Sequence, residues 1–313
     1  MATQFENLWV TDKHSGHEFT FIDWQCPTCG PSEESFLGYR EGSHQADGLG
    51  LKTRIVQCES CSLLYANPFP VAKDLSVVYG DPARYFSGHD SSAKIEANRQ
   101  ILRKVVQLTI SNPRVIDIGS GCGELLVAAQ EENITAVGTE VSTAMIEFAE
   151  KKYKVKLSRQ TIEQAAIEFT GAFDAVILNA VLEHAYDPAM MIISARKLLK
   201  KGGILYIDVP NEPNILTSVA SCLNKLLGGD TSFNLSPTWE PYHVYGFNRR
   251  SLEILLGKNG FLIEEFKVNC QVALAPRRGL RGHAEVWIAN RLNSVGNLTG
   301  TSGNLSLWAR AGD

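Results

Sequence analysis

The stretch VIDIGSGCGELL, Val115 to Leu126, decides the fold class of this 313-residue chain. Apolar and β-branched residues surround an acid, Asp117, and lead into three glycines spaced two apart, Gly119, Gly121 and Gly123. A helix-forming run follows, so the pattern is that of a strand, a tight turn and a helix start. Backbone N–H groups at such a junction commonly hold a nucleotide, and the stretch therefore predicts a nucleotide-type cofactor.

Two familiar glycine-turn motifs do not fit this stretch. A Walker loop needs a Lys followed by Ser or Thr, and these glycines lead to no such pair. A dinucleotide fingerprint would place its third glycine at position 124, which is Glu124. The carboxylate of Glu124 at the helix N-terminus would also repel a pyrophosphate. The sequence thus favours a cofactor without phosphate groups.

The segments around this stretch alternate between strand and helix patterns from about residue 93 to the end. Expected strands cover 114–119, 134–140, 173–179, 204–211, 261–268 and 304–311. Expected helices cover 93–108, 123–132, 142–153, 161–169, 187–203, 214–227, 250–260 and 280–292. This order predicts an α/β fold with a doubly wound, Rossmann-like sheet.

Two CxxC pairs near the N-terminus predict a metal site. Cys26 and Cys29 lie in CPTCG, and Cys58 and Cys61 lie in CESC. Two such turns can surround one tetrahedral Zn²⁺, and four thiolates leave no open position, so this zinc would be structural. The alternatives are a redox CxxC or unrelated core thiols. We expect a β-rich zinc-ribbon module at 1–66, a connector at 67–92, and a cofactor domain at 93–313 with a lid insertion at about 211–247.

Composition limits the class of protein. Hydrophobic residues make up 44% and charged residues 20%, as in an ordinary globular protein, and the net charge is −4. The sequence has no dense Lys/Arg run, so we expect no general nucleic-acid binding. It shows neither a signal-peptide pattern nor a run long enough for a transmembrane segment. Seven unevenly placed cysteines do not suit a secreted disulfide scaffold, which favours a cytoplasmic protein.

Several stretches resemble one enzyme superfamily. VIDIGSGCGELL resembles the first motif of class I S-adenosylmethionine-dependent methyltransferases, in which an acid near the strand end precedes GxGxG. FDAVILNAVLEHAYDP resembles the fourth strand and LEH segment of ubiquinone-pathway-type O-methyltransferases, and LLKKGGILYIDVPN resembles the elements that follow. The N-terminal CPTCG, CESC and VYGDPARYF segments resemble the zinc-ribbon methyltransferases that often act on sugars or secondary metabolites. TWEPYHVYGF is loosely similar to a Glu/Tyr/His segment of the sugar C-methyltransferases, whose usual YHEHFSYFS is not present.

This resemblance implies S-adenosylmethionine as the cofactor and assigns residues to it. Asp117 would balance the cationic end of the cofactor, and the glycines would let the backbone approach its methionine part. Glu140, at the end of the second strand, would accept hydrogen bonds from the ribose hydroxyls. The implied cofactor residues are Asp117, Gly119, Gly121, Gly123, Glu140 and Asn179.

Two histidines are candidate general bases for removing a proton from the acceptor. His184 follows the fourth strand, at the carboxyl end where α/β proteins bind ligands. His243 lies in EPYHVYGF, in a loop that could close over the same mouth. Either one could instead be a histidine hydrogen-bonded to loop backbone. Glu240, Tyr242 and Tyr245 are candidate substrate contacts, with surface or packing roles as the alternative.

The sequence therefore predicts methyl transfer from S-adenosylmethionine to a small-molecule acceptor, a sugar or secondary metabolite, with oxygen favoured over carbon. One rival is a nucleic-acid- or protein-modifying methyltransferase. Residues 1–66 carry four Lys or Arg against nine Asp or Glu, which argues against that rival. The other rival is a non-catalytic cofactor-binding module, against which the complete glycine loop and Glu140 argue. The identity of the acceptor and the oligomeric state stay open.

Overall fold

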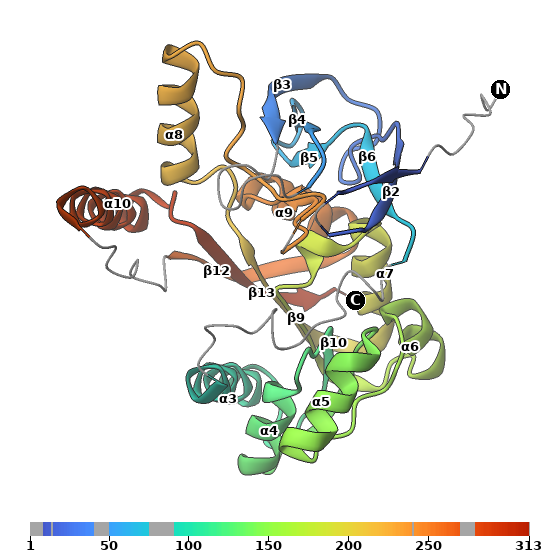
Figure 1. Cartoon of the computed structure of the whole chain (residues 1–313). Helices are drawn as coiled ribbons and strands as arrows, with labels where there is room; N and C mark the ends of the chain where they lie inside the picture. Colours follow the sequence, from blue (N-terminus) through green and yellow to red (C-terminus); the bar gives the residue numbers. More distant parts are fainter. Residues whose placement is uncertain are drawn as a thin grey trace. The chain divides into compact units, whose positions relative to one another are not determined.

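A computed structural model describes residues 9–13, 15–40, 50–74, 91–239, 241–269 and 279–312 (Figure 1). The contacts divide the chain into two units. The first unit comprises Met1–Lys73, Asp208–Ile254 and Phe266–Ser306, and the second comprises Asp74–Ile207, Leu255–Glu265 and Leu307–Asp313. Each unit is thus assembled from three separate stretches of chain, and each is described by itself below.

The central element is a six-stranded sheet in the order β12-β13-β10-β9-β7-β8. Its strands are β7 (Arg114–Ile118), β8 (Thr135–Thr139), β9 (Phe173–Asn179), β10 (Leu199–Pro210), β12 (Phe261–Asn269) and β13 (Asn304–Ala311). Strand β7 pairs in parallel with β8 and with β9, so that Val115 is opposite both Ala136 and Ala175. All six strands lie where the sequence predicts them, although β10 begins five residues earlier than expected. The predicted α/β fold class is confirmed.

The helices also follow the predicted order. They are α3 (Ser91–Leu108), α4 (Glu124–Glu131), α5 (Thr143–Tyr153), α6 (Ile162–Glu168), α7 (Pro188–Leu198), α8 (Ile215–Leu226), α9 (Arg249–Lys258) and α10 (Gly279–Thr299), with a 3₁₀ turn at Leu182–His184. The Ser142 side chain caps α5 by accepting a hydrogen bond from the Met145 N–H, and Asp187 caps α7 in the same way. Pro188 at the first turn of α7 needs no hydrogen-bond partner for its nitrogen.

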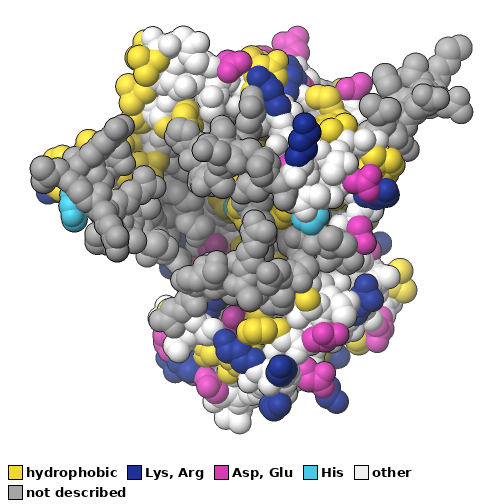
Figure 2. All heavy atoms as spheres, in the orientation of Figure 1, with side chains coloured by type: hydrophobic (Ala, Val, Ile, Leu, Met, Phe, Trp, Pro, Cys, Tyr) yellow, Lys and Arg dark blue, Asp and Glu magenta, His cyan; other side chains and the backbone are white. Residues whose placement is uncertain are grey.

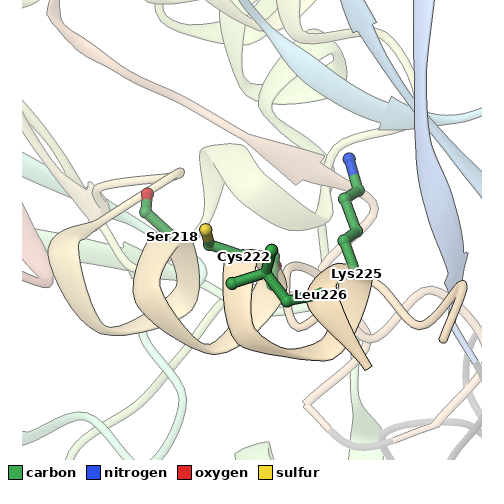
Figure 3. Close-up of a pocket in the computed structure, with 5 residues that line it drawn as sticks. Ser218, Cys222, Lys225 and Leu226 are labelled. Atoms are coloured by element: carbon green, nitrogen blue, oxygen red, sulfur yellow. The ribbon is translucent and has the colours of Figure 1, made fainter. Parts of the chain in front are cut away.

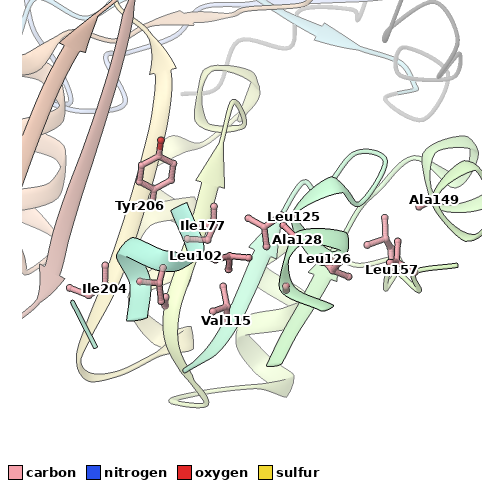
Figure 4. Close-up of a cluster of buried hydrophobic side chains, with 14 of the residues drawn as sticks. Leu102, Val115, Leu125, Leu126, Ala128, Ala149, Leu157, Ile177, Ile204 and Tyr206 are labelled. Atoms are coloured by element: carbon pink, nitrogen blue, oxygen red, sulfur yellow. The ribbon is translucent and has the colours of Figure 1, made fainter. Parts of the chain in front are cut away.

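The core of the second unit forms where helices pack on the parallel strands (Figure 4). Leu102 of α3, Val115 of β7, Leu125 of α4 and Ile177 of β9 are almost completely buried. Full burial of such a side chain stabilises the fold by about 1.5–3 kcal/mol. This packing fixes the carboxyl ends of β7, β8 and β9, where the predicted cofactor residues lie.

The first unit contains two antiparallel sheets. One has the order β1-β2-β6 and consists of β1 (Val10–Thr11), β2 (Glu18–Ile22) and β6 (Phe69–Ala72). The other has the order β11-β5-β4-β3 and consists of β3 (Glu34–Arg40), β4 (Thr53–Cys58), β5 (Leu64–Ala66) and β11 (Tyr245–Gly246). Strand β11 belongs to the expected lid insertion, yet it pairs with β5 of the N-terminal module. The four-stranded sheet is therefore built from segments far apart in the sequence.

Helices α8 and α10 belong to the first unit and contact each other. Helix α10 continues seven residues beyond the expected end at 292. In this extension Gly296 comes close to α8, where a Cβ would lie 3.1 Å from Ile215 Cγ2. Apolar side chains of both helices are exposed, including Leu226 and Trp287, and Figure 2 shows apolar atoms along the outer edge of α8. Among the described helices, none has the length and apolar character that a membrane span requires.

Candidate functional site

The glycine loop after β7 has a backbone that requires glycine. Gly119, Gly121 and Gly123 have φ angles of +66°, +54° and +80°, in the left-handed region that other residues rarely adopt. A Cβ at Gly119 would lie 2.8 Å from Val181 Cγ2, and one at Gly123 would lie 2.7 Å from Val155 Cγ2. The loop therefore combines a tight turn with close approach to the chain after β9. Because glycine has no side chain, the backbone of the loop is open to close contact with a ligand.

Glu140, directly after β8, holds this loop in place. Its Oε2 accepts a hydrogen bond from the Gly121 N–H at 2.9 Å, and its Oε1 accepts from the Val141 and Ser142 N–H groups at 2.8 Å each. A carboxylate has about four acceptor positions, so three are occupied by the protein's own backbone. One position on Oε2 is left for a ligand hydroxyl. Glu140 thus organises the loop and keeps one acceptor position unused by these backbone groups.

Asp117 is an acid inside the protein. It belongs to β7 and is 4% exposed. Burial, with smaller contributions from the nearby carboxylates of Glu124 and Glu140, raises the pKa of its carboxyl group to about 7. A bound cation beside Asp117 would lower its pKa again and favour the ionised form. This buried acid is therefore suited to a cationic ligand group, as the sequence predicts for the cofactor.

Two residues of α3 join this region although the sequence analysis did not select them. Asn98 is 8% exposed, and its Oδ1 accepts a hydrogen bond from Nδ2 of Asn179, the last residue of β9, at 3.5 Å. Lys94 lies one turn earlier on α3, where burial lowers its pKa and the carboxylate of Glu124 opposes that change. The i, i+4 spacing of a Lys and an Asn on one helix face was the available signal.

His184 lies in the 3₁₀ turn that follows β9, together with Glu183. Its Nε2 is 3.8 Å from Oε1 of Glu183, whose side chain is 1% exposed. The residue after Asn179, Ala180, has a φ of +55°, and such strained positions are found most often at functional sites. The second unit thus brings together Asp117, the glycine loop, Glu140, Asn179 and His184 at the carboxyl ends of neighbouring strands.

The other predicted acceptor residues belong to the first unit. His243 lies just before β11, and its backbone N–H donates to Ser236 Oγ at 3.2 Å. Tyr242 is 6% exposed with a φ of +63°. Tyr245 is 1% exposed and its hydroxyl accepts a hydrogen bond from Trp24 Nε1 at 2.9 Å, so it lies inside the sheet packing. Glu240 lies outside the described residues.

The four predicted zinc ligands come together in the first unit. The sulfur atoms of Cys26, Cys29, Cys58 and Cys61 all lie within 4.8 Å of one another, and the Cys26 and Cys61 sulfurs are 3.5 Å apart. Thiolates bound tetrahedrally at about 2.3 Å from Zn²⁺ would be about 3.8 Å apart, so the arrangement fits zinc and not a disulfide. All four are free thiols.

The two CxxC turns have the same local geometry. The residue after each second cysteine, Gly30 or Ser62, has a positive φ, of 81° or 63°. Its N–H donates to the carbonyl of the first cysteine, Cys26 or Cys58, at 2.7 or 2.8 Å. Each turn therefore directs its two thiols toward the same point, and the four side chains together supply a closed set of sulfur donors.

One pocket lies on the surface of the first unit. It has a volume of about 410 Å³ and is lined by Ser218, Ser221, Cys222, Lys225 and Leu226 (Figure 3). All five residues belong to α8, and none of them is an acid or a histidine. This pocket therefore lacks the groups that the predicted chemistry needs.

The sheet order, the glycine loop and the acid that follows β8 together define a class I S-adenosylmethionine-dependent methyltransferase. The model of the methyltransferase-domain family matches residues 91–265, and the chain belongs to this family. The match begins at the first residue of α3 and ends within β12.

Curated relatives and solved structures agree with this class. The ubiquinone biosynthesis O-methyltransferase of Xanthomonas oryzae pv. oryzae (strain PXO99A) is 34% identical over 110 residues, which cover 34% of this chain and 46% of the relative. The enzyme of the same name from Colwellia psychrerythraea is 30% identical over 129 residues, covering 40% and 50%. The chain thus spans about half the length of these relatives. A chain in the complex of the Haloferax volcanii Trm112 methyltransferase activator with a methyltransferase has the same fold, with a TM-score of 0.51, 14% identity and coverage of 75% and 99%.

Proposed function

We propose that this protein transfers the methyl group of S-adenosylmethionine to a hydroxyl of a small-molecule acceptor. The observation that carries the proposal is the Glu140–Gly121 hydrogen bond, which holds a glycine loop of the methyltransferase class beside the buried acid Asp117. When bound, S-adenosylmethionine supplies an electrophilic methyl group on a sulfonium. The protein's part is to orient both reactants and exclude water, because this reaction needs little covalent help.

The protein's own residues would divide this work between them. The backbone of the loop glycines would contact the methionine part of the cofactor. The remaining lone pair of Glu140 Oε2 would accept a hydrogen bond from a ribose hydroxyl. Asp117 would face the ammonium group directly or through water. Asn179, held by Asn98, would contact the cofactor from the neighbouring strand.

For the acceptor, two observations favour oxygen. The curated relatives are O-methyltransferases by name. The chain also offers two histidines, His184 and His243, that we propose as candidates for the general base that a hydroxyl acceptor requires. A sugar or a secondary metabolite is the acceptor class that the cysteine module and its resemblance favour.

The cysteine cluster has a separate role in this proposal. Its four thiols would hold one Zn²⁺, and no coordination position would be left for a substrate. The zinc would therefore stabilise the first unit and take no part in the chemistry. This assignment rests on the sulfur distances, not on the catalytic proposal.

The function is tested by titrating purified protein with S-adenosylhomocysteine and by assaying transfer of labelled methyl from S-adenosylmethionine to a panel of phenols and hexoses. We expect binding of S-adenosylhomocysteine and methylation of at least one hydroxylated member. If the protein binds S-adenosylhomocysteine but transfers methyl to no member of the panel, and to neither nucleic acid nor protein, a non-catalytic cofactor-binding module would be favoured. If the protein binds NAD tightly and does not bind S-adenosylhomocysteine, the assignment of S-adenosylmethionine as the cofactor would be wrong.

A further inference from the structure

The segment between β10 and α9 attaches to both edges of the four-stranded sheet in the first unit. At one edge, Thr231 bridges Tyr39, with hydrogen bonds from the Tyr39 N–H to Asp230 O at 2.7 Å and from the Ser232 N–H to Tyr39 O at 2.8 Å. This approach requires Gly38, because a Cβ there would lie 2.5 Å from Asp230 O. At the other edge, β11 pairs with β5. The chain between these edges is therefore fixed at both ends.

Leu235, between the two attachments, is held in three ways. Its side chain is 4% exposed and packs in a core with Ile55, Leu64 and Ala66 of the sheet. Its N–H donates to Glu212 Oε2 at 3.0 Å, and its carbonyl accepts from Arg40 Nε at 3.0 Å. Both charged residues are buried, at 8% and 6% exposed. A left-handed φ of +64°, unusual for leucine, is thus stabilised by an acid on one side and a base on the other.

The loop that follows is closed at its base. The Ser236 N–H donates to the His243 carbonyl at 3.1 Å, and the His243 N–H donates back to Ser236 Oγ at 3.2 Å. Tyr242, beside His243, has the second left-handed φ, and its N–H donates to Trp239 O at 2.7 Å. Arg40 also contacts the loop directly, since its guanidinium lies 5.1 Å from the centre of the Trp239 ring.

Two buried polar atoms in this segment point to a ligand. The indole N–H of Trp239 and Oδ1 of Asn234 have no hydrogen-bond partner within the described part of the chain. The two side chains belong to residues that are 7% and 4% exposed. Buried polar atoms are rarely left unpaired, so each such atom needs an explanation, such as a bound group. A hydroxyl can serve either atom, because it both donates and accepts.

We propose that the loop from Leu235 to His243 is the acceptor-recognition loop, that Arg40 and Glu212 are the positioning residues that set its shape, and that the Trp239 N–H binds an acceptor hydroxyl. This inference rests on the proposed function and names part of its substrate site. Arg40 acts through the carbonyls of Leu235 and Ser232, at 3.0 and 3.4 Å. Glu212 fixes the opposite side of Leu235. A displacement of about 1 Å in such a loop can cost about 100-fold in rate.

The shape of the loop is tested with Arg40→Met in the full-length protein. We expect the amides of residues 232–243 to exchange with deuterium at least about tenfold faster, because Arg40 no longer holds two of their carbonyls. The affinity for S-adenosylhomocysteine should change less than about twofold, since neither partner is a cofactor residue. The matched control is Arg249→Met, which breaks an exposed ion pair with Glu253 in the same unit and should change nothing. Unchanged exchange in Arg40→Met overturns the positioning role.

A double variant separates positioning from support of the fold. Arg40 and Glu212 are both buried and attract each other electrostatically, although each makes its hydrogen bonds to Leu235. Removing both avoids leaving one buried charge without the other, so Arg40→Met with Glu212→Leu should regain much of any lost thermal stability. Turnover of the best acceptor from the phenol and hexose panel should nevertheless stay at least about tenfold below wild type, because the two backbone hydrogen bonds of Leu235 are still missing. Recovery of both stability and turnover would show that the pair only supports the fold.

Trp239→Phe tests contact with the acceptor. This change keeps an aromatic ring beside Arg40 and removes the indole N–H together with part of the ring system. The Arg40 hydrogen bonds to the loop stay in place, so exchange in 232–243 should change much less than in Arg40→Met. We expect KM for the hydroxylated acceptor to rise about fivefold to tenfold, the effect of one lost hydrogen bond. An unchanged KM overturns the assignment of Trp239. If the wild type binds S-adenosylhomocysteine but methylates no panel member, the proposed function fails, whereas the exchange result still decides the roles of Arg40 and Glu212.

Discussion

Cofactor affinity should depend on pH through Asp117. Burial raises the pKa of this carboxyl group to about 7 in the free protein, so at neutral pH half of the molecules carry a proton there. Both S-adenosylmethionine and S-adenosylhomocysteine bring an ammonium group, which favours the ionised carboxylate. Binding below pH 7 must therefore expel a proton. The affinity for these ligands therefore reaches its full value well above pH 7 and weakens as the pH falls through 7.

The size of this effect follows from the pKa. The apparent Kd equals the Kd of the protein with ionised Asp117 multiplied by 1 + 10^(pKa − pH), where the pKa is that of Asp117 in the free protein. This holds as long as the pH stays above the pKa of Asp117 in the complex. Affinity for S-adenosylhomocysteine should accordingly be about tenfold weaker at pH 6 than at pH 8, which is about 1.4 kcal/mol. Glu140 acts in the same direction, because burial raises its pKa as well and the proposed ribose contact needs its ionised form.

Isothermal titration calorimetry at pH 6, 7 and 8, in two buffers of different ionisation enthalpy, measures both the affinity and the protons released. We expect nearly one proton released per ligand at pH 6 and almost none at pH 8. Asp117→Asn should bind more weakly at pH 8 and lose this pH dependence. Equal affinities at pH 6 and pH 8, or a variant that keeps the wild-type slope, would refute the role of Asp117.

Three further predictions concern the loop, the metal and the base. Glu140→Ala should weaken S-adenosylhomocysteine binding by about 1.5–3 kcal/mol in calorimetry, because the loop loses its anchor as well as an acceptor, whereas an unchanged affinity would contradict this. Elemental analysis should find about one zinc per chain, and Cys58→Ser should lower the melting temperature without affecting cofactor binding; a disulfide within the cluster would remove the prediction. His243→Ala and His243→Gln should both lower kcat by about 10²–10⁴-fold, and wild-type activity should fall as the pH is lowered, because a protonated imidazole cannot accept the acceptor's proton. Activity restored by Gln would make His243 a positioning residue, and a loss seen only in His184→Ala would move the base to the turn after β9.

The sequence was sufficient for the parts of the fold that depend on local pattern. Strands such as Phe173–Asn179 are unbroken apolar runs, and the glycine loop is recognisable because its turn needs residues without a Cβ. Caps such as Ser142 also lie within three residues of the N–H they satisfy. Periodicity, glycine placement and capping are all readable within a window of about a dozen residues.

The parts that could not be predicted depend on contacts distant in sequence. Arg40 and Leu235 are 195 positions apart, and nothing near either residue indicates that a guanidinium will meet that carbonyl. Strand β11 has only two residues and is defined by its pairing with β5 alone. For Glu140 the position was predicted but its bond to the Gly121 N–H was not, because the sequence suggests a ligand contact and does not reveal the backbone that reaches it first.

The shared sheet of the first unit also limits how this protein can be divided. Its strands β3, β4 and β5 come from the N-terminal region, whereas the segments at both of its edges come from beyond residue 207. An excised N-terminal fragment would therefore expose two unpaired strand edges and the cavity left by Leu235, features that promote aggregation. We expect such a fragment to be insoluble even with zinc present. For the same reason the N-terminal module cannot be exchanged between methyltransferases as one continuous cassette: any transplant that keeps it folded must carry both lengths of chain.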